Sequence, residues 1–102
     1  MSKIKTIPFS NVVEYYQRLR PEGHWFDAGT KRFFGCRLPK AAFETNAGLL
    51  FISSELDFNR ERRYYNVRRQ KLNGDIETIG EFNAYRTRAE AMNAVRNLHA
   101  GV

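Results

Sequence analysis

The pattern of apolar and polar positions predicts an antiparallel hairpin in the C-terminal half of the chain. Residues 63–70 (RYYNVRRQ) are rich in aromatic and β-branched side chains, and residues 75–85 (DIETIGEFNAY) alternate between apolar and polar. Asn73-Gly74 lies between them. This dipeptide is typical of a type I′ turn, because both residues tolerate a positive φ. We therefore predict two strands joined by a two-residue turn.

A two-residue turn would set the pairing of the strands. With Leu72 opposite Asp75, Arg69 lies opposite Thr78 and Tyr65 lies opposite Phe82. Tyr65, Val67 and Phe82 then share one face of the hairpin. The other face carries Tyr64, Asn66, Arg68, Glu77, Ile79 and Glu81. Ile79 does not suit that polar face, and a bulge at Gly80 would turn it inward; the sequence leaves both arrangements open.

A helix is expected directly after the hairpin, over residues 87–99. Thr87 and Glu90 have the spacing of a capping box, in which each side chain bonds the backbone amide of the other residue. Ala91, Val95 and Leu98 form an apolar stripe at helical spacing. Gly101 is a suitable stop.

The N-terminal half predicts helices followed by one further strand. Residues 1–9 are expected to be a loose lead or a short edge strand, and residues 10–40 are expected to be helical, with a first helix from Ser10 or Asn11. Residues 40–48 have the composition of a loop. Residues 49–56 (LLFISSEL) are continuously apolar at their start, which favours a central strand.

These elements together predict the α+β class. A chain of 102 residues suits one domain. We expect a three-stranded antiparallel sheet within residues 48–85, packed against N-terminal and C-terminal helices in the order α-(α)-β-β-β-α.

The charge of the chain is basic and unevenly distributed. The net charge is +6, and residues 1–40 hold eight Lys or Arg against three acids, whereas residues 41–102 hold nine against eight. A basic surface favours an anionic partner such as nucleic acid. Within the hairpin, Arg68 and Arg69 lie on one strand and Glu77 and Glu81 on the next, so these charges can instead pair across the strands.

The densest aromatic segment covers residues 24–39 (HWFDAGTKRFFGCRLP). Its rings can dock a short helix onto the sheet. Alternatively, some of them, interleaved with Lys31, Arg32 and Arg37, can stack on bases or fill a pocket of a partner protein.

Motifs for catalysis, metals and membranes are not found. Cys36, His24 and His99 do not have zinc-ligand spacing, and one cysteine does not build a disulfide framework. The glycines match no phosphate-cradling motif. We therefore predict neither an enzyme nor a cofactor or metal. The sequence has no apolar run long enough to span a membrane and no signal-peptide pattern, and its single cysteine is compatible with a reducing cytoplasm.

Two resemblances add to this reading. The segments HWFDAGTKRFFGCRLP, LLFISSE, YYNVRRQ and IGEFNAYRTRAEA together resemble a family of small uncharacterised proteins carried by bacteriophages, prophages and plasmids. This resemblance implies a mobile-element origin and a bacterial cytoplasm. Three strands followed by a helix also resemble, in topology, nucleic-acid-binding domains such as the double-stranded RNA-binding domain and the plant ethylene-response and integrase-arm DNA-binding domains.

We accordingly predict a small, basic, non-enzymatic binding protein of a mobile genetic element, with nucleic acid as its partner. The alternative is a protein-binding inhibitor of a host defence system, of the anti-CRISPR or anti-restriction type, whose partner is a host protein or nucleoprotein complex. In either case the expected binding residues are Lys31, Arg32, Arg37, Tyr64, Arg68, Arg69 and Arg88.

Overall fold

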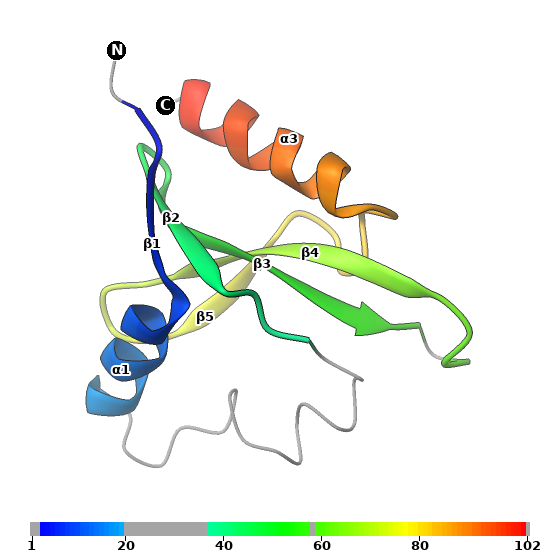
Figure 1. Cartoon of the computed structure of the whole chain (residues 1–102), viewed down its shortest axis with the longest axis horizontal. Coiled ribbons are helices and arrows are strands. Elements are labelled where there is room, and N and C mark those ends of the chain that lie inside the picture. The colour runs from blue at the N-terminus through cyan, green and yellow to red at the C-terminus, as the bar shows by residue number, and fades with distance from the viewer. Residues whose placement is uncertain (1–2, 20–36, 58, 102) are drawn as a thin grey trace.

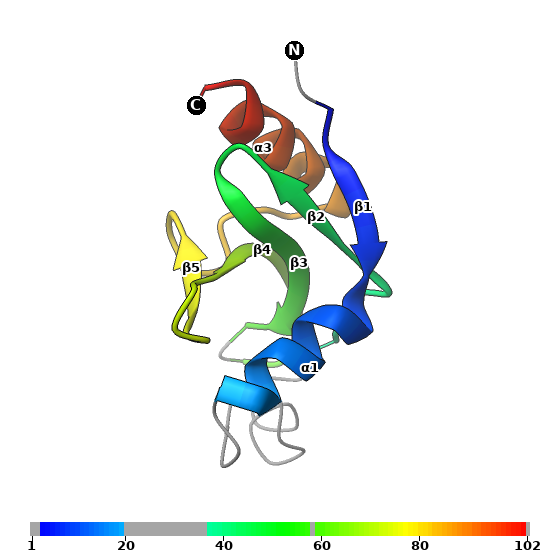
Figure 2. The ribbon, with the colours of Figure 1, turned by 90° about the vertical axis from the view of Figure 1, so that its left-hand side faces the viewer.

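The computed structural model describes residues 3–19, 37–57 and 59–101, and it contains a five-stranded antiparallel sheet with two helices. The strands follow each other in the order β1-β2-β3-β4-β5. Their bounds are β1 Lys5–Pro8, β2 Ala41–Thr45, β3 Gly48–Leu56, β4 Arg63–Gln70 and β5 Ile76–Ile79, and the helices are α1 Phe9–Leu19 and α3 Arg88–Ala100. Figures 1 and 2 show α3 above the sheet and α1 below it.

The prediction of a three-stranded sheet is wrong, although the α+β class holds. Strand β1 is the short edge strand that the sequence left open beside a loose lead, whereas β2 comes from residues expected to be a loop. The two strands pair from Lys5 opposite Glu44 to Pro8 opposite Ala41. Their local signals are weak because β1 has four residues and ends in proline, and β2 begins with two alanines. Proline is tolerated in β1 because this strand lies at the edge of the sheet.

The predicted register of the β4–β5 hairpin is wrong by one residue. Lys71 N–H donates to the Asp75 carbonyl at 2.8 Å, and Gly74 N–H donates to the Lys71 carbonyl at 2.9 Å. Gly74 has φ +89°, whereas Asn73 does not have the positive φ that a type I′ turn requires. The loop therefore has three residues and ends in a left-handed glycine.

This shift decides the position of Ile79. It lies opposite Val67, and Thr78 lies opposite Arg68. Because side chains alternate between the two faces of a strand, a shift by one residue moves each of them to the other face. Ile79 consequently packs against the core beneath α3, where the register alone places it. Tyr65 pairs with Tyr85 rather than with Phe82.

The two faces of the sheet carry separate apolar clusters. The cluster beneath α3 is formed by Phe43, Leu50, Ile52, Val67, Ala91 and Val95. The cluster on the α1 side is formed by Phe9, Val12, Ala42 and Phe51. The Phe9 and Phe51 rings meet edge to face, with their centroids 4.9 Å apart. A sheet covered by a helix on each face explains why β3 is buried along most of its length.

The helix ends agree in part with the sequence. Thr87 is the N-cap of α3, and its Oγ1 accepts from the Glu90 amide at 3.1 Å, as predicted. The Glu90 carboxylate accepts instead from the Arg86 amide at 3.4 Å. Helix α1 begins at Phe9, before the predicted Ser10 or Asn11. The segment expected to form a second helix, within residues 24–39, lies mostly outside the described residues.

Candidate functional site

Arg68 lies in a buried polar network on the α1 face of the sheet. Its Nη2 lies 2.6 Å from Glu55 Oε1, and the residues are 8% and 2% exposed. Its Nε donates to Ser53 Oγ at 3.1 Å, and its Nη1 donates to Thr78 Oγ1. The Phe82 ring covers the guanidinium at 5.6 Å from the ring centroid. Arg68 thus already has an internal counter-ion, and a phosphate would have to compete with Glu55 for it.

The same network anchors the loop that leads into α3. Asn66 Nδ2 donates to Glu55 Oε2 at 2.5 Å and to Asn83 Oδ1 at 2.9 Å. The backbone N–H of Asn83, whose φ is +58°, donates to Asn66 Oδ1 at 2.6 Å. Tyr85, two residues after Asn83, exchanges backbone hydrogen bonds of 2.7 and 3.3 Å with Tyr65. The network therefore helps to position the start of α3 against β4.

Arg69 is occupied by a cross-strand ion pair. Its guanidinium bonds the Glu77 carboxylate, which also lies 3.3 Å from Lys71 Nζ. The hydrogen bond from Arg69, supported by the one from Lys71, holds the pKa of Glu77 below its ordinary value. The charge-pairing interpretation of the hairpin therefore applies to Arg69, whereas the acid that neutralises Arg68 is Glu55, which the sequence analysis had not singled out.

The remaining predicted binding residues fall into three groups. Lys31 and Arg32 lie outside the described residues. Tyr64 is half-buried on β4, opposite Glu55. Arg37 and Arg88, far apart in the sequence, come together at one cleft.

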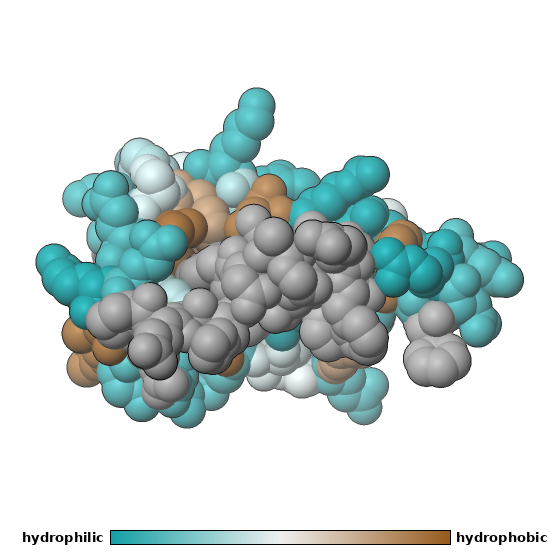
Figure 3. Space-filling view, turned by 90° about the horizontal axis from the view of Figure 1, so that it is seen from below, coloured by the Kyte–Doolittle hydropathy of each residue, from teal (hydrophilic) through white to brown (hydrophobic). Residues whose placement is uncertain are grey.

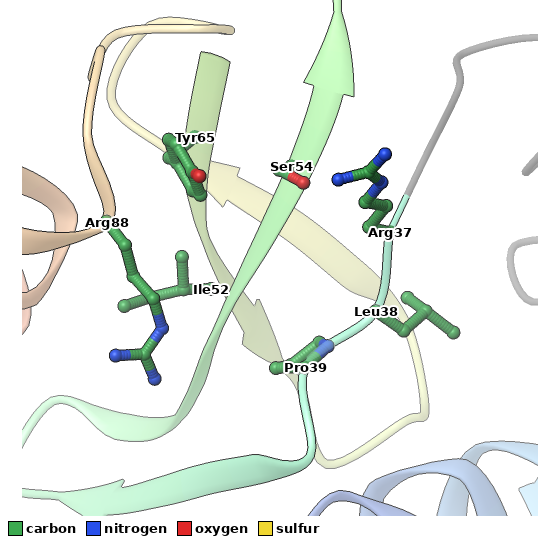
Figure 4. Close-up of a pocket in the computed structure, with 7 residues that line it drawn as sticks. All are labelled: Arg37, Leu38, Pro39, Ile52, Ser54, Tyr65 and Arg88. Carbon is green, nitrogen blue, oxygen red and sulfur yellow. The ribbon is translucent and has the colours of Figure 1, made fainter. Parts of the chain in front are cut away.

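This cleft has a volume of about 150 Å³ and is formed by four parts of the chain (Figure 4). Arg37 precedes β2 and exchanges backbone bonds of 2.8 and 3.2 Å with Ser54 of β3. Arg88 is the first residue of α3, placed there by the Thr87 cap. The cleft is lined by Arg37, Leu38, Pro39, Ile52, Ser54, Tyr65 and Arg88.

The arrangement of the cleft is an apolar floor between two cations. Figure 4 shows the guanidinium groups of Arg37 and Arg88 on opposite sides, with Ile52 and Pro39 between them and the Ser54 and Tyr65 hydroxyls along one side. Among the described residues, neither guanidinium has a carboxylate partner within ion-pair distance. Glu90, the acid nearest to Arg88 in the sequence, accepts from the Arg86 amide. The cleft can therefore attract an anion.

A third arginine, Arg63, bonds Ser54 at the side of the cleft. Arg63 Nη1 donates to Ser54 Oγ at 3.1 Å and to the Ser54 carbonyl at 3.2 Å. Ser54 is only 6% exposed, and this bond fixes its hydroxyl as an acceptor toward Arg63. Neither Ser54 nor Tyr65 is among the binding residues predicted from the sequence. Their positions on the same sheet face, Ser54 opposite Tyr65, could have been found only from the β3–β4 register.

A larger groove of about 840 Å³ lies between α1 and the β4–β5 turn. The Tyr15 hydroxyl donates to the Leu72 carbonyl at 2.8 Å, and the Leu72 side chain is 91% exposed beside it. Ile7 and Leu49 add apolar surface. In the view from below, the described part of the surface is mainly hydrophilic, with hydrophobic residues among the hydrophilic ones (Figure 3).

The described residues hold neither a metal-binding cluster nor a helix that could span a membrane. Within the described ranges, no group of three or more His, Cys, Asp or Glu side chains is arranged to hold a metal ion. Neither α1 nor α3, the helices that the structure describes, is long and apolar enough to cross a membrane.

Comparison with known proteins gives one match. No curated protein and no solved structure matches the chain. A family model described as "Family of unknown function (DUF7447)" matches residues 9–96. The matched region runs from the first residue of α1 into α3, and so includes both strands and the helix that form the cleft. Because the match covers most of the sequence, the chain belongs to this family of unknown function, DUF7447.

Proposed function

We propose that the protein is a small, basic, non-enzymatic nucleic-acid-binding protein that contacts its partner through the Arg37–Arg88 cleft. The observation that carries this proposal is the separation of the four described arginines among the predicted binding residues into two groups. Arg68 and Arg69 are neutralised by Glu55 and Glu77, whereas Arg37 and Arg88 have no such partner in the described structure. Unpaired guanidinium groups that share one cleft are suited to phosphate contacts.

The biological setting is proposed from the sequence resemblance alone. We place the protein in the bacterial cytoplasm, as an accessory factor of a phage, prophage or plasmid. In that setting a nucleic-acid-binding protein would act on the DNA or RNA of the element or of its host.

The proposal is tested by charge reversal on α3. Arg88→Glu should weaken the binding of labelled DNA or RNA at least tenfold in fluorescence anisotropy, because it replaces a phosphate-binding cation by an anion. The matched control is Arg96→Glu, which changes the net charge equally on the same helix but away from the cleft. An acidic residue is favourable in the first turn of a helix, so Arg88→Glu should not unfold α3.

Two outcomes would count against this site. Equal weakening by Arg88→Glu and Arg96→Glu would mean that only the net charge of the protein matters. No measurable binding of single-stranded DNA, duplex DNA or duplex RNA by the unmodified protein at low salt would contradict the proposed function itself.

A second candidate function, a protein-binding inhibitor of a host defence system, is favoured by the groove beside α1. Leu72 is 91% exposed at its rim, and the groove is large enough for several side chains of a partner. Leu72→Asp should abolish the capture of such a partner while leaving nucleic-acid binding intact. Capture that survives Leu72→Asp would exclude the groove as the contact surface.

A further inference from the structure

The cleft has a shape that phosphate attraction alone does not require. Its floor is apolar, formed by Pro39 and Ile52, and it lies between the two guanidinium groups instead of beside them. A surface that only follows a polyphosphate backbone needs cations but no hollow. The floor therefore indicates a ligand with an uncharged group between two negative charges.

The volume of the cleft limits the size of the uncharged group that can occupy it. About 150 Å³ is below the roughly 300 to 1,000 Å³ of sites that enclose a whole small molecule. The cleft thus suits one unit of an extended chain that continues past both arginines. An extended chain is also consistent with Figure 4, in which the two guanidinium groups do not converge on a single point.

The polar atoms of the wall add a hydrogen-bonding edge. Ser54 Oγ accepts from Arg63, and an arginine cannot accept in return, so the hydroxyl proton of Ser54 is available to an acceptor other than Arg63. Tyr65 presents an aromatic ring and a hydroxyl at the same cleft. Oxygen and ring-nitrogen acceptors on a flat apolar body are the features of a nucleobase.

We propose that the cleft takes one nucleotide of a single-stranded nucleic acid, its base against Tyr65, Ile52 and Pro39 and its flanking phosphates on Arg37 and Arg88. This inference rests on the proposed nucleic-acid function and narrows its substrate. A duplex keeps its bases stacked inside, so it offers the cleft phosphates only. A single strand exposes bases that can stack on aromatic side chains.

The test compares labelled twelve-nucleotide probes by fluorescence anisotropy with the full chain. One probe is oligothymidylate, one is the same backbone with abasic units, and one is duplex DNA of equal length. Removal of the bases should weaken binding between about five-fold and about a hundredfold, the range expected for stacking of one base. The duplex should bind more weakly than oligothymidylate, and a matching oligouridylate probe shows whether RNA is preferred over DNA.

The outcomes separate this inference from the broader function. Equal affinity for the abasic and the thymidylate probes, or tighter binding of the duplex, would overturn the single-strand inference and leave phosphate binding in place. No binding of any probe would overturn both. A labelled glutamate-rich peptide that bound as tightly as oligothymidylate would overturn the inference in favour of an acidic protein partner.

A pair of variants locates the effect in the cleft. Tyr65→Phe keeps the ring and should keep the preference for thymidylate over the abasic probe, whereas Tyr65→Leu should reduce that preference to less than about twofold if the stacking contribution is lost. Tyr65 also packs against the core beneath α3, so folding is checked first by circular dichroism. If Tyr65→Leu does not fold, the comparison of probes with the unmodified protein decides. A full preference in folded Tyr65→Leu would overturn the assignment of the base to this cleft.

Discussion

At the scale of single residues, Arg68 shows how burial changes the role of a basic side chain. The sequence places it on a polar hairpin strand, where it suits a phosphate contact. In the structure it is 8% exposed and is bonded to Glu55, Ser53 and Thr78. A charge removed from water in this way needs its counter-ion, because an unpaired buried carboxylate is costly.

Arg68→Met should therefore destabilise the protein by about 3 to 5 kcal/mol, because it leaves Glu55 buried without its cation. The free energy of unfolding is measured by urea denaturation. The double variant Arg68→Met, Glu55→Met removes both charges and should be less destabilised than the single variant. A loss below about 1 kcal/mol in Arg68→Met would show that the pair is not structurally important.

The Glu77 ion pair predicts a dependence of stability on pH. The hydrogen bond that the Glu77 carboxylate accepts from Arg69 lowers the pKa of Glu77 in the folded state. The ion pair therefore stabilises the fold fully above the ordinary glutamate pKa of 4.5. This stabilisation is lost as the pH falls through the lowered pKa. At pH 7, Glu77→Gln should lower the free energy of unfolding by about 0.5 kcal/mol, and the melting temperature should fall slightly as a result. That difference should shrink as the pH falls below 4.5 and through the lowered pKa of Glu77. A difference that stays constant as the pH is lowered would contradict the ionic contribution.

At the scale of elements, the β4–β5 turn determines which side chains enter the core. Because Gly74 takes the left-handed position of a three-residue loop, Ile79 faces Val67 and joins the cluster beneath α3. A two-residue turn would have moved each β5 side chain to the opposite face. The turn therefore contributes to the core through the register that it sets.

Gly74→Val should destabilise the protein by about 1 to 3 kcal/mol, since a β-branched residue at φ +89° is strained. The control in the same loop is Leu72→Ser, which should change stability by less than about 0.5 kcal/mol because that side chain is 91% exposed. Thermal unfolding measures both. Full stability of Gly74→Val would contradict this turn geometry.

The elements that could be predicted are those with strong local signals. Strand β4 has the predicted bounds, and the Thr87 cap of α3 is confirmed by its bond to the Glu90 amide. Strands β1 and β2 carry weak signals and become strands through pairing with each other and with β3. The hairpin register could not be read reliably because Asn-Gly also fits a three-residue loop with glycine last.

The candidate site was predictable only as a set of residue types. A search for basic residues finds Arg37 and Arg88, but it also finds Arg68 and Arg69, and nothing local to the sequence separates the two groups. The separation depends on Glu55 of β3 and Glu77 of β5, which become partners only once the strands are paired. Ser54 and Tyr65 enter the site for the same reason.

At the scale of the whole molecule, the excess positive charge is not uniformly available. The net charge is +6, but part of the basic content of the sheet is neutralised on β4 by the neighbouring strands β3 and β5. Arg37 and Arg88, at the cleft beside the start of α3, take no part in these ion pairs. Nucleic-acid binding should thus depend on a few named positions, and less on the total charge.

The most direct test of this account is the salt dependence of binding, measured as the dissociation constant for a labelled single strand from about 50 to 200 mM NaCl. Each phosphate contact of a single strand contributes about 0.7 to the slope of log affinity against log salt. We predict that Arg37→Ala and Arg88→Ala each lower this slope by about 0.7, and that Arg96→Ala leaves it unchanged. Equal slopes in all four proteins would contradict the assignment of phosphate contacts to the cleft.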